Sequence, residues 1–287
     1  MSDATGAEKV GSLHRKPVPL NLGDQIEDVS MRLDATTAEL AKQDTSGQPI
    51  RVILVGHSVG AYILMSLLDL RGRERRSSRD MAEQLPSDII GGICLFPTVV
   101  DLYKSPNGIK ARWVANIPYF SLFVHSLAKV LCTLLSFASL VKLVERLTGQ
   151  PTQAATVTAS FLASATGVRQ AIFLAQHEIL EMREDRWIDD VWTTTATSAD
   201  SRDLGTNRTK LFFYWGADDH WIANSTRDAV IAARAATASE EGVKPHMEID
   251  RLGTPHDFCT RPNHSAIVAN KVAEYVRAVV TAARTGQ

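Results

Sequence analysis

The feature that most constrains the fold is a short apolar run that leads through a glycine-bounded turn into an apolar helix. Residues 51–55, Arg-Val-Ile-Leu-Val, are apolar and β-branched, which is typical of a buried parallel strand. The turn Gly56-His57-Ser58-Val59-Gly60 follows at once, and residues 61–70 have the composition of an apolar helix. A strand, a tight turn and a helix in succession are the parts from which parallel α/β sheets are built.

The same alternation of strand and helix continues along the chain. Further buried strands are predicted at 89–96, 210–215 and 247–252. Because strands alternate with helices, the sequence predicts an α/β fold with a mostly parallel sheet. The helices are expected at 23–40, at 224–238 with Asn224 or Ser225 as the N-cap, and at 264–284.

A long insertion separates the second predicted strand from the third, and it has no clear strand pattern. Its most apolar part is 113–147, where Lys129 is the only charged residue between 113 and 141. We therefore predict a sheet core in two parts with a helical cap inserted between them. The predicted boundaries are 1–20 for an irregular segment, 21–98 and 209–287 for the core, and 99–208 for the cap.

Charge and cysteine content exclude several classes of protein. The 31 Lys and Arg residues against 32 Asp and Glu residues give a net charge of -1, so no nucleic-acid partner is predicted. Five arginines in 71–80 are interpreted as a solvated loop, with a partner-binding patch as the alternative. Three widely spaced cysteines indicate neither disulfides nor a zinc site, and no metal or nucleotide motif is present, so no metal and no cofactor are predicted. A reducing compartment fits best, and the lack of an apolar run in 1–15 predicts that the chain is not secreted.

The turn at 56–60 matches the G-x-S-x-G pattern of a nucleophile elbow. This chemistry needs a serine on a sharp turn between strand and helix, and here that residue is Ser58. Gly56 and Gly60 are expected to let strand and helix approach closely. The N–H of Val59 is expected to face a developing oxyanion. A plain glycine-rich turn is the alternative interpretation.

A serine nucleophile needs a base, and the base needs a carboxylate to orient it. Asp219 follows the strand predicted at 210–215, and His256 follows the one predicted at 247–252. The order Ser58, Asp219, His256 is the one that this kind of fold uses. Asp218 is the alternative orienting acid and His220 the alternative base, because adjacent loop residues cannot be ranked by spacing alone.

Three blocks of sequence resemble the lipid droplet-associated hydrolase family, within the α/β-hydrolase superfamily. They are 23–27 (Gly-Asp-Gln-Ile-Glu) with 55–62 (Val-Gly-His-Ser-Val-Gly-Ala-Tyr), 95–98 (Leu-Phe-Pro-Thr) with 105–108 (Ser-Pro-Asn-Gly), and 213–216 (Phe-Tyr-Trp-Gly) with Asp219, Trp221 and Pro255-His256.

The resemblance implies an α/β-hydrolase fold and a triad of Ser58, Asp219 and His256 that hydrolyses lipid carboxylic esters through an acyl-enzyme. It also implies location on lipid droplets, in the cytoplasm or at the endoplasmic reticulum, and a role in lipid storage. Two alternatives remain open. One is a droplet-binding protein with little or no catalysis, and the other is an acyltransferase that uses the same triad.

The chain departs from the family before Ser58. The family has early strands and a glycine- and proline-rich loop that helps to form the oxyanion hole, and we find no such loop here. We therefore expect the fold to be incomplete at its N-terminus and turnover to be reduced.

The apolar stretch 117–147 is expected to bind the monolayer of a lipid droplet or a membrane surface. A spanning helix needs about 20 apolar residues, and Pro118 and Lys129 interrupt this stretch. Helices that lie in the monolayer are therefore the expectation. A cap packed on the sheet and a true transmembrane span are the alternatives.

Overall fold

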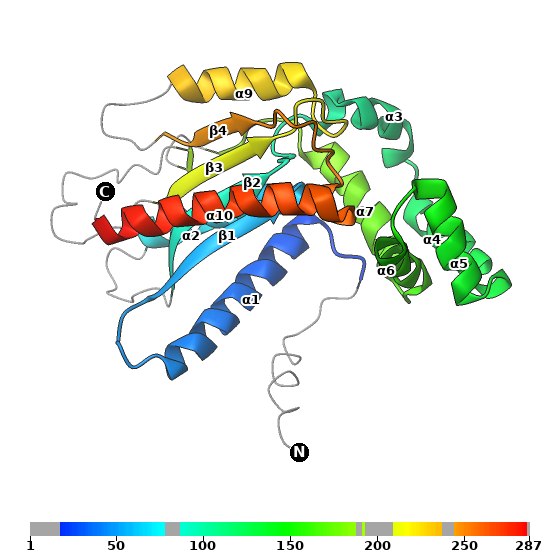
Figure 1. Cartoon of the computed structure of the whole chain (residues 1–287), viewed down its shortest axis with the longest axis horizontal. Helices are drawn as coiled ribbons and strands as arrows, with labels where there is room; N and C mark the ends of the chain where they lie inside the picture. Colours follow the sequence, from blue (N-terminus) through cyan, green and yellow to red (C-terminus); the bar gives the residue numbers. More distant parts are fainter. Residues whose placement is uncertain (1–17, 78–86, 188–190, 193–208, 237–243, 286–287) are drawn as a thin grey trace.

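The computed structural model describes residues 18–77, 87–187, 191–192, 209–236 and 244–285. Its centre is a four-stranded sheet in the order β1-β2-β3-β4, in which every neighbouring pair is parallel (Figure 1). The predicted α/β fold with a mostly parallel sheet is thus confirmed. The strands are β1 (Ile50–His57), β2 (Ser87–Leu95), β3 (Lys210–Trp215) and β4 (His246–Ile249).

Two apolar layers cover the sheet, one on each face. Side chains alternate along β3, so that Phe213 and Trp215 pack into one cluster while Phe212 and Tyr214 pack into the other. The first cluster lies under α1 (Leu22–Gln43), α2 (Val59–Ser77) and α9 (Asn224–Ala236), and the second under α10 (Pro262–Thr285), which crosses the front of the sheet in Figure 1.

Helix α2 is longer than the sequence indicated. The prediction of a loop at 71–80 is wrong for 71–77, which are helical. Residues 78–80 lie outside the described residues. The helix continues because Arg71 is paired: its guanidinium lies 2.6 Å from Asp34 of α1 and 2.8 Å from Glu74. Arg73 pairs with Asp69 one turn earlier in the same way.

Strand β4 ends earlier than predicted, at Ile249 rather than at residue 252. The next residue, Asp250, is buried and accepts a hydrogen bond from the backbone N–H of Thr254 at 2.6 Å. Gly253 has φ of 68°, a left-handed conformation that turns the chain. Helix α9 is described as far as Ala236. The predicted helix end at 238 falls in 237–243, which lie outside the described residues.

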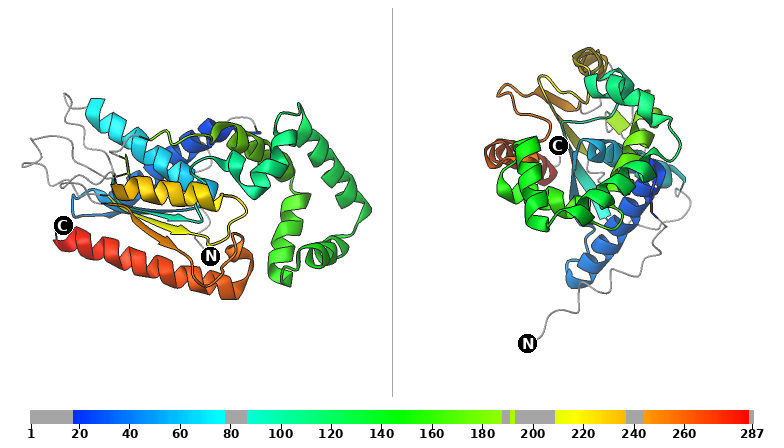
Figure 2. Two further views of the ribbon diagram at one scale, coloured as in Figure 1. Left: turned by 90° about the horizontal axis from the view of Figure 1, so that it is seen from above. Right: turned by 90° about the vertical axis from the view of Figure 1, so that its right-hand side faces the viewer.

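Between β2 and β3 the described chain is helical, and its helices project from one end of the sheet (Figures 1 and 2). We call α3 to α7 the cap. Helices α5 and α6 have an apolar core of their own, built around Leu140, Val144, Ala155 and Ala159. The cap helices, which follow the short 3-10 turn η3 (Leu102–Lys104), are α3 (Pro106–Ala115), α4 (Phe120–Leu134), α5 (Phe137–Thr148), α6 (Thr152–Ala163) and α7 (Gly167–Glu181).

No helix that the structure describes is long and apolar enough to cross a membrane by itself. Two pairs of consecutive helices have enough length and apolar composition to span a membrane only when the two members are taken together. These pairs are α3 with α4 and α6 with α7. The members of these pairs are bent against each other by 98° and 91°.

Strand β1 forms one edge of the described sheet. It pairs with β2 along its whole length, and no other described strand pairs with it. Half of the surface of Val55, on this strand, is exposed. The strand that leads into Ser58 therefore has one backbone edge without a described partner.

Candidate active site

Ser58 occupies a tight turn between β1 and α2. Its φ of 55° is a left-handed conformation that is costly for a residue with a side chain. Such a conformation at the serine is typical of a nucleophile elbow, where it projects the hydroxyl out of the turn. The backbone N–H of Ser58 donates to the carbonyl of Leu95 at 3.0 Å, which fixes the turn to β2.

The two glycines of the motif have different roles. A Cβ atom at Gly56 would lie 2.3 Å from the carbonyl oxygen of Gly60, so only glycine fits where the helix folds back over the strand. A Cβ atom at Gly60 would meet nothing within 4 Å. Close approach of strand and helix thus depends on Gly56, and the expected packing role of Gly60 is wrong.

Ser58, His256 and Asp219 form one hydrogen-bonded chain. The Oγ of Ser58 lies 2.9 Å from His256 Nε2, and His256 Nδ1 lies 2.8 Å from Asp219 Oδ2. The carboxylate can only accept, so Nδ1–H donates to Asp219 and Nε2 is left to accept from the Ser58 hydroxyl. The three residues follow β1, β4 and β3, and they meet at the carboxyl end of the sheet.

The alternative candidates lie outside this chain of hydrogen bonds. Asp218 is exposed and accepts a hydrogen bond from the Asn224 side chain at 3.0 Å. His220 is exposed, and its backbone carbonyl accepts from Asn107 N–H at 2.9 Å. Asp219, by contrast, is buried.

The loop that carries Asp219 is fixed by buried polar contacts. The second carboxylate oxygen of Asp219 accepts from the N–H of Trp221 at 2.8 Å. The buried guanidinium of Arg227 donates to the carbonyls of Gly216 and Ala217, at 2.9 and 2.6 Å. These contacts hold the Asp219 carboxylate in position without a bound substrate.

Residues 105–108, singled out in the sequence, form the capped start of α3. The buried Ser105 hydroxyl donates to Leu102 O at 2.7 Å and accepts from Gly108 N–H at 2.8 Å. A Cβ atom at Gly108 would lie only 1.9 Å from Leu102 O. Since Asn107 also bonds the backbone of His220, this motif joins the start of the cap to the loop of Asp219.

Two functional contacts were missed at the level of sequence. Asp250, 2% exposed, accepts from the Tyr214 hydroxyl at 2.5 Å and from Thr254, and thereby holds the loop that leads to His256. His57 Nε2–H donates to the backbone carbonyl of His256 at 2.9 Å. Asp250 directly follows β4 in the structure, but the strand was predicted to run to residue 252, so this signal was hidden. Nothing in the sequence marks the His57 contact.

Burial and charge shift several pKa values. Burial, together with the nearby His256, lowers the pKa of His57 below its usual value. Burial raises the pKa of the Cys94 thiol well above its usual value, so this thiol stays protonated. Burial also raises the pKa of Glu178, on α7 of the cap, to about 7. In the described part of the chain, no group of three or more His, Cys, Asp or Glu side chains is placed to hold a metal ion.

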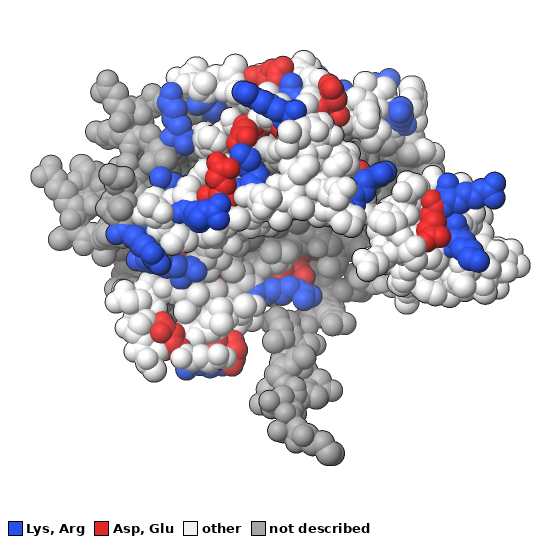
Figure 3. Space-filling model, in the orientation of Figure 1, with Lys and Arg blue, Asp and Glu red and all other residues white. Residues whose placement is uncertain are grey.

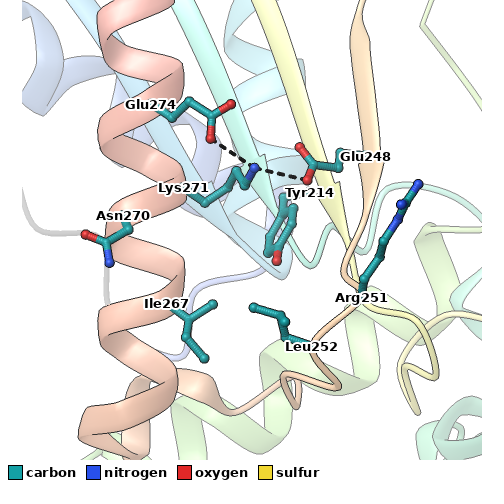
Figure 4. Close-up of a pocket in the computed structure, with 8 residues that line it drawn as sticks. All are labelled: Tyr214, Glu248, Arg251, Leu252, Ile267, Asn270, Lys271 and Glu274. Carbon is teal, nitrogen blue, oxygen red and sulfur yellow. Dashed lines mark hydrogen bonds and ion pairs between the residues drawn. The ribbon is translucent and has the colours of Figure 1, made fainter.

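A cavity of about 340 Å³ lies between β4 and α10, apart from the residues of the hydrogen-bonded chain (Figure 4). Lys271 is one of the residues that line it, and pairs with Glu248 and Glu274, each at 3.0 Å. Its positive charge is therefore already neutralised by protein groups. Tyr214 forms part of the wall, and its hydroxyl binds Asp250.

The cap exposes an apolar stripe on α4. Its members are spaced by four, three and four residues, which places them on one face of a helix. Their exposed fractions lie between 54% and 76%. In Figure 3 one group of charged side chains lies at the far right of the cap, over α4 and α5, and further positively charged side chains lie over α3. The stripe consists of Phe123, Leu127, Val130 and Leu134.

Comparisons with known proteins show the family to which the chain belongs. A sequence model described as lipid-droplet associated hydrolase matches residues 3–259. A lipid droplet-associated hydrolase of Gallus gallus is 23% identical over 189 residues, which cover 63% of this chain and 48% of that protein. The chain thus spans about half the length of this relative.

Solved structures show the same fold. The peroxisomal alpha-beta-hydrolase Lpx1 of Saccharomyces cerevisiae aligns with a TM-score of 0.50 and 15% identity, over 96% of this chain and 65% of that one. A haloalkane dehalogenase loop variant from Bradyrhizobium elkanii aligns with a TM-score of 0.51 and 14% identity, over 96% and 80%. The resemblance found in the sequence is confirmed, and the chain belongs to the lipid-droplet associated hydrolase family.

Proposed function

We propose that this protein hydrolyses carboxylic esters of lipids through a covalent intermediate on Ser58. The observation that carries the proposal is the unbroken hydrogen-bonded chain from Ser58 through His256 to the buried Asp219. A serine, a base and an orienting carboxylate in this geometry are the parts that nucleophilic acyl transfer requires.

Each residue has a defined role in the proposed reaction. Ser58 Oγ attacks the ester carbonyl while His256 Nε2 takes its proton and later returns it to the leaving alcohol. Asp219 keeps Nδ1 protonated and stabilises the imidazolium. Val59 is the first residue of α2, so its N–H has no acceptor within the helix and is available to the oxyanion. Water then attacks the acyl-enzyme and releases the acid.

A lipid substrate is supported by the surface of the cap. The stripe on α4 exposes large apolar side chains that a protein surface rarely presents in one row. We propose that 117–147 lies in the monolayer of a lipid droplet, with the apolar stripe among the acyl chains. The similarity to a lipid droplet-associated hydrolase of Gallus gallus supports this location.

The test is ester turnover by Ser58→Ala with a short acyl ester that does not need a lipid surface. Ser46→Ala is the matched control, because Ser46 is exposed and precedes the start of β1, whereas Ser58 follows the end of that strand. We expect Ser58→Ala to lose measurable turnover and the control to keep it. Undiminished turnover by Ser58→Ala would overturn the proposal.

The exposed cap also favours a second candidate, a lipid-binding protein with little catalysis. Binding to phospholipid-coated triglyceride droplets without any ester turnover by the folded protein would select it. Product analysis with a second alcohol present separates hydrolysis from acyl transfer, because only a transferase forms the new ester.

A further inference from the structure

We propose that His57, inside the G-x-S-x-G motif, is a positioning residue that holds His256 in register with Ser58. Its Nε2–H donates to the backbone carbonyl of His256 at 2.9 Å, between residues 199 positions apart in the chain. The inference extends the proposed function, since it concerns the base of the same site.

The contact ties a loop to a rigid strand. His57 is the last residue of β1, and its backbone pairs with Leu95 of β2. His256 lies instead in the loop between β4 and α10, seven residues beyond the end of β4. The hydrogen bond from His57 therefore connects His256 directly to β1, the strand that leads into Ser58. The positions of His256 and Ser58 are thus both fixed by β1.

The loop is held at two points of its backbone. Asp250 binds the N–H and the hydroxyl of Thr254, at 2.6 and 3.2 Å. His57 then binds the carbonyl of His256, two residues further on. With both ends of this short span anchored, the imidazole of His256 has little freedom other than rotation of its own side chain.

The surroundings keep His57 in the form that donates. A carbonyl only accepts, so the contact requires a proton on Nε2 of His57. The ring packs against Phe258 and His256, with centroids 4.8 and 5.0 Å away. The charged or titratable groups acting on it are His256, which lowers its pKa along with burial, and Asp219, which raises it. A neutral His57 adds no second positive charge when His256 becomes an imidazolium during turnover.

The experiment compares three substitutions at His57 with His246→Gln, an exposed histidine at the start of β4. His57→Leu removes the donor, and His57→Asn keeps a polar group too short to reach the carbonyl. His57→Gln places an amide donor near the position of Nε2. We expect kcat to fall about tenfold to a hundredfold in the Leu and Asn variants with KM little changed, because small displacements of a reacting group have effects of that size. His57→Gln and His246→Gln should keep most of the turnover.

A spectroscopic readout separates positioning from folding and from the proposed function. The Nδ1 proton of His256, assigned with a His256→Gln variant, should give a resolved nuclear magnetic resonance signal in the wild-type protein and in His57→Gln. It should be broadened or displaced in folded His57→Asn and His57→Leu. This signal reports the His256 geometry even if Ser58→Ala shows that ester hydrolysis is not the activity.

An unchanged His256 signal together with unchanged kcat in His57→Asn and His57→Leu would overturn the inference. Equal losses in His57→Gln and His57→Leu would also overturn it, because the donor would then not be what matters. If His57→Leu does not fold, the comparison of the Asn and Gln variants decides in the same way.

Discussion

At the scale of single residues, the turn around Ser58 depends on the absence of a side chain at Gly56. Gly56 has no room for a Cβ atom, while Gly60 has free space around it. The sequence pattern treats the two glycines alike, so only the structure separates them.

We expect Gly56→Ala to lower the free energy of unfolding by about 1–3 kcal/mol or more, the usual cost of overpacking. Gly60→Ala should leave it unchanged or raise it by about 0.4–1 kcal/mol, since alanine restricts the unfolded chain. Urea unfolding of the two variants is the measurement. Equal destabilisation by both would contradict this account of the turn.

Asp219 and Asp218 provide a second matched pair. Asp219→Asn should lower turnover about 10⁴-fold, because an amide favours the wrong tautomer of the histidine, as in the worked serine-protease triad. Asp218→Asn changes only an exposed contact with Asn224 and should keep most of the turnover. Steady-state ester kinetics test this, and a larger loss in Asp218→Asn would reverse the assignment.

Glu178 should make stability depend on pH. Burial raises its pKa from 4.5 to about 7, so between these values the folded protein binds a proton that the unfolded chain has lost. The contribution of Glu178 to the free energy of unfolding is greatest below pH 4.5. It falls as the pH rises to about 7, by about 3 kcal/mol in all at 1.36 kcal/mol per pH unit.

Glu178→Gln should remove this fall, and the exposed Glu184→Gln should keep it. Urea unfolding from pH 4.5 to pH 8 measures both. A Glu178→Gln variant whose stability has the same pH dependence as the wild-type protein would show that this carboxyl is not responsible.

At the scale of elements, the sequence predicts the bounds of β3 correctly and the ends of β4 and α2 wrongly. The bounds predicted for β3 are those observed, because five buried apolar or aromatic residues follow one another there. The end of α2 was mispredicted because arginines and serines are common in loops. What extends the helix is the ion pair of Arg71 with Asp34, which comes from another helix and is invisible in a local window.

The apolar stripe on α4 should be needed for binding to lipid. Leu127→Ser combined with Leu134→Ser places hydroxyls in the row and should weaken binding to phospholipid-coated triglyceride droplets by flotation. Stability should change little, because both side chains are largely exposed. Leu40→Ser with Leu70→Ser, on α1 and α2, is the matched control. Unchanged flotation of the Leu127/Leu134 variant would contradict the proposed lipid contact.

At the scale of the whole molecule, the parallel sheet explains why the candidate site was readable in the sequence. Residues that follow parallel strands meet at one edge, so Ser58, Asp219 and His256 could be grouped from their positions alone. The ranking of Asp219 over Asp218 needed the structure, since it depends on which of two adjacent side chains reaches His256. The contact between His57 and His256 joins distant parts of the chain and leaves no local pattern.

The central claim is that Ser58 is a nucleophile activated by His256. A fluorophosphonate probe tests it directly, because Ser58 Oγ would bond to phosphorus and expel fluoride, and the adduct can be located by peptide mass. We predict an adduct on Ser58 in the wild-type protein, none in Ser58→Ala, and strongly slowed labelling in His256→Gln. A folded wild-type protein that does not label at Ser58, or labelling at Ser58 that proceeds equally fast in His256→Gln, would contradict the account.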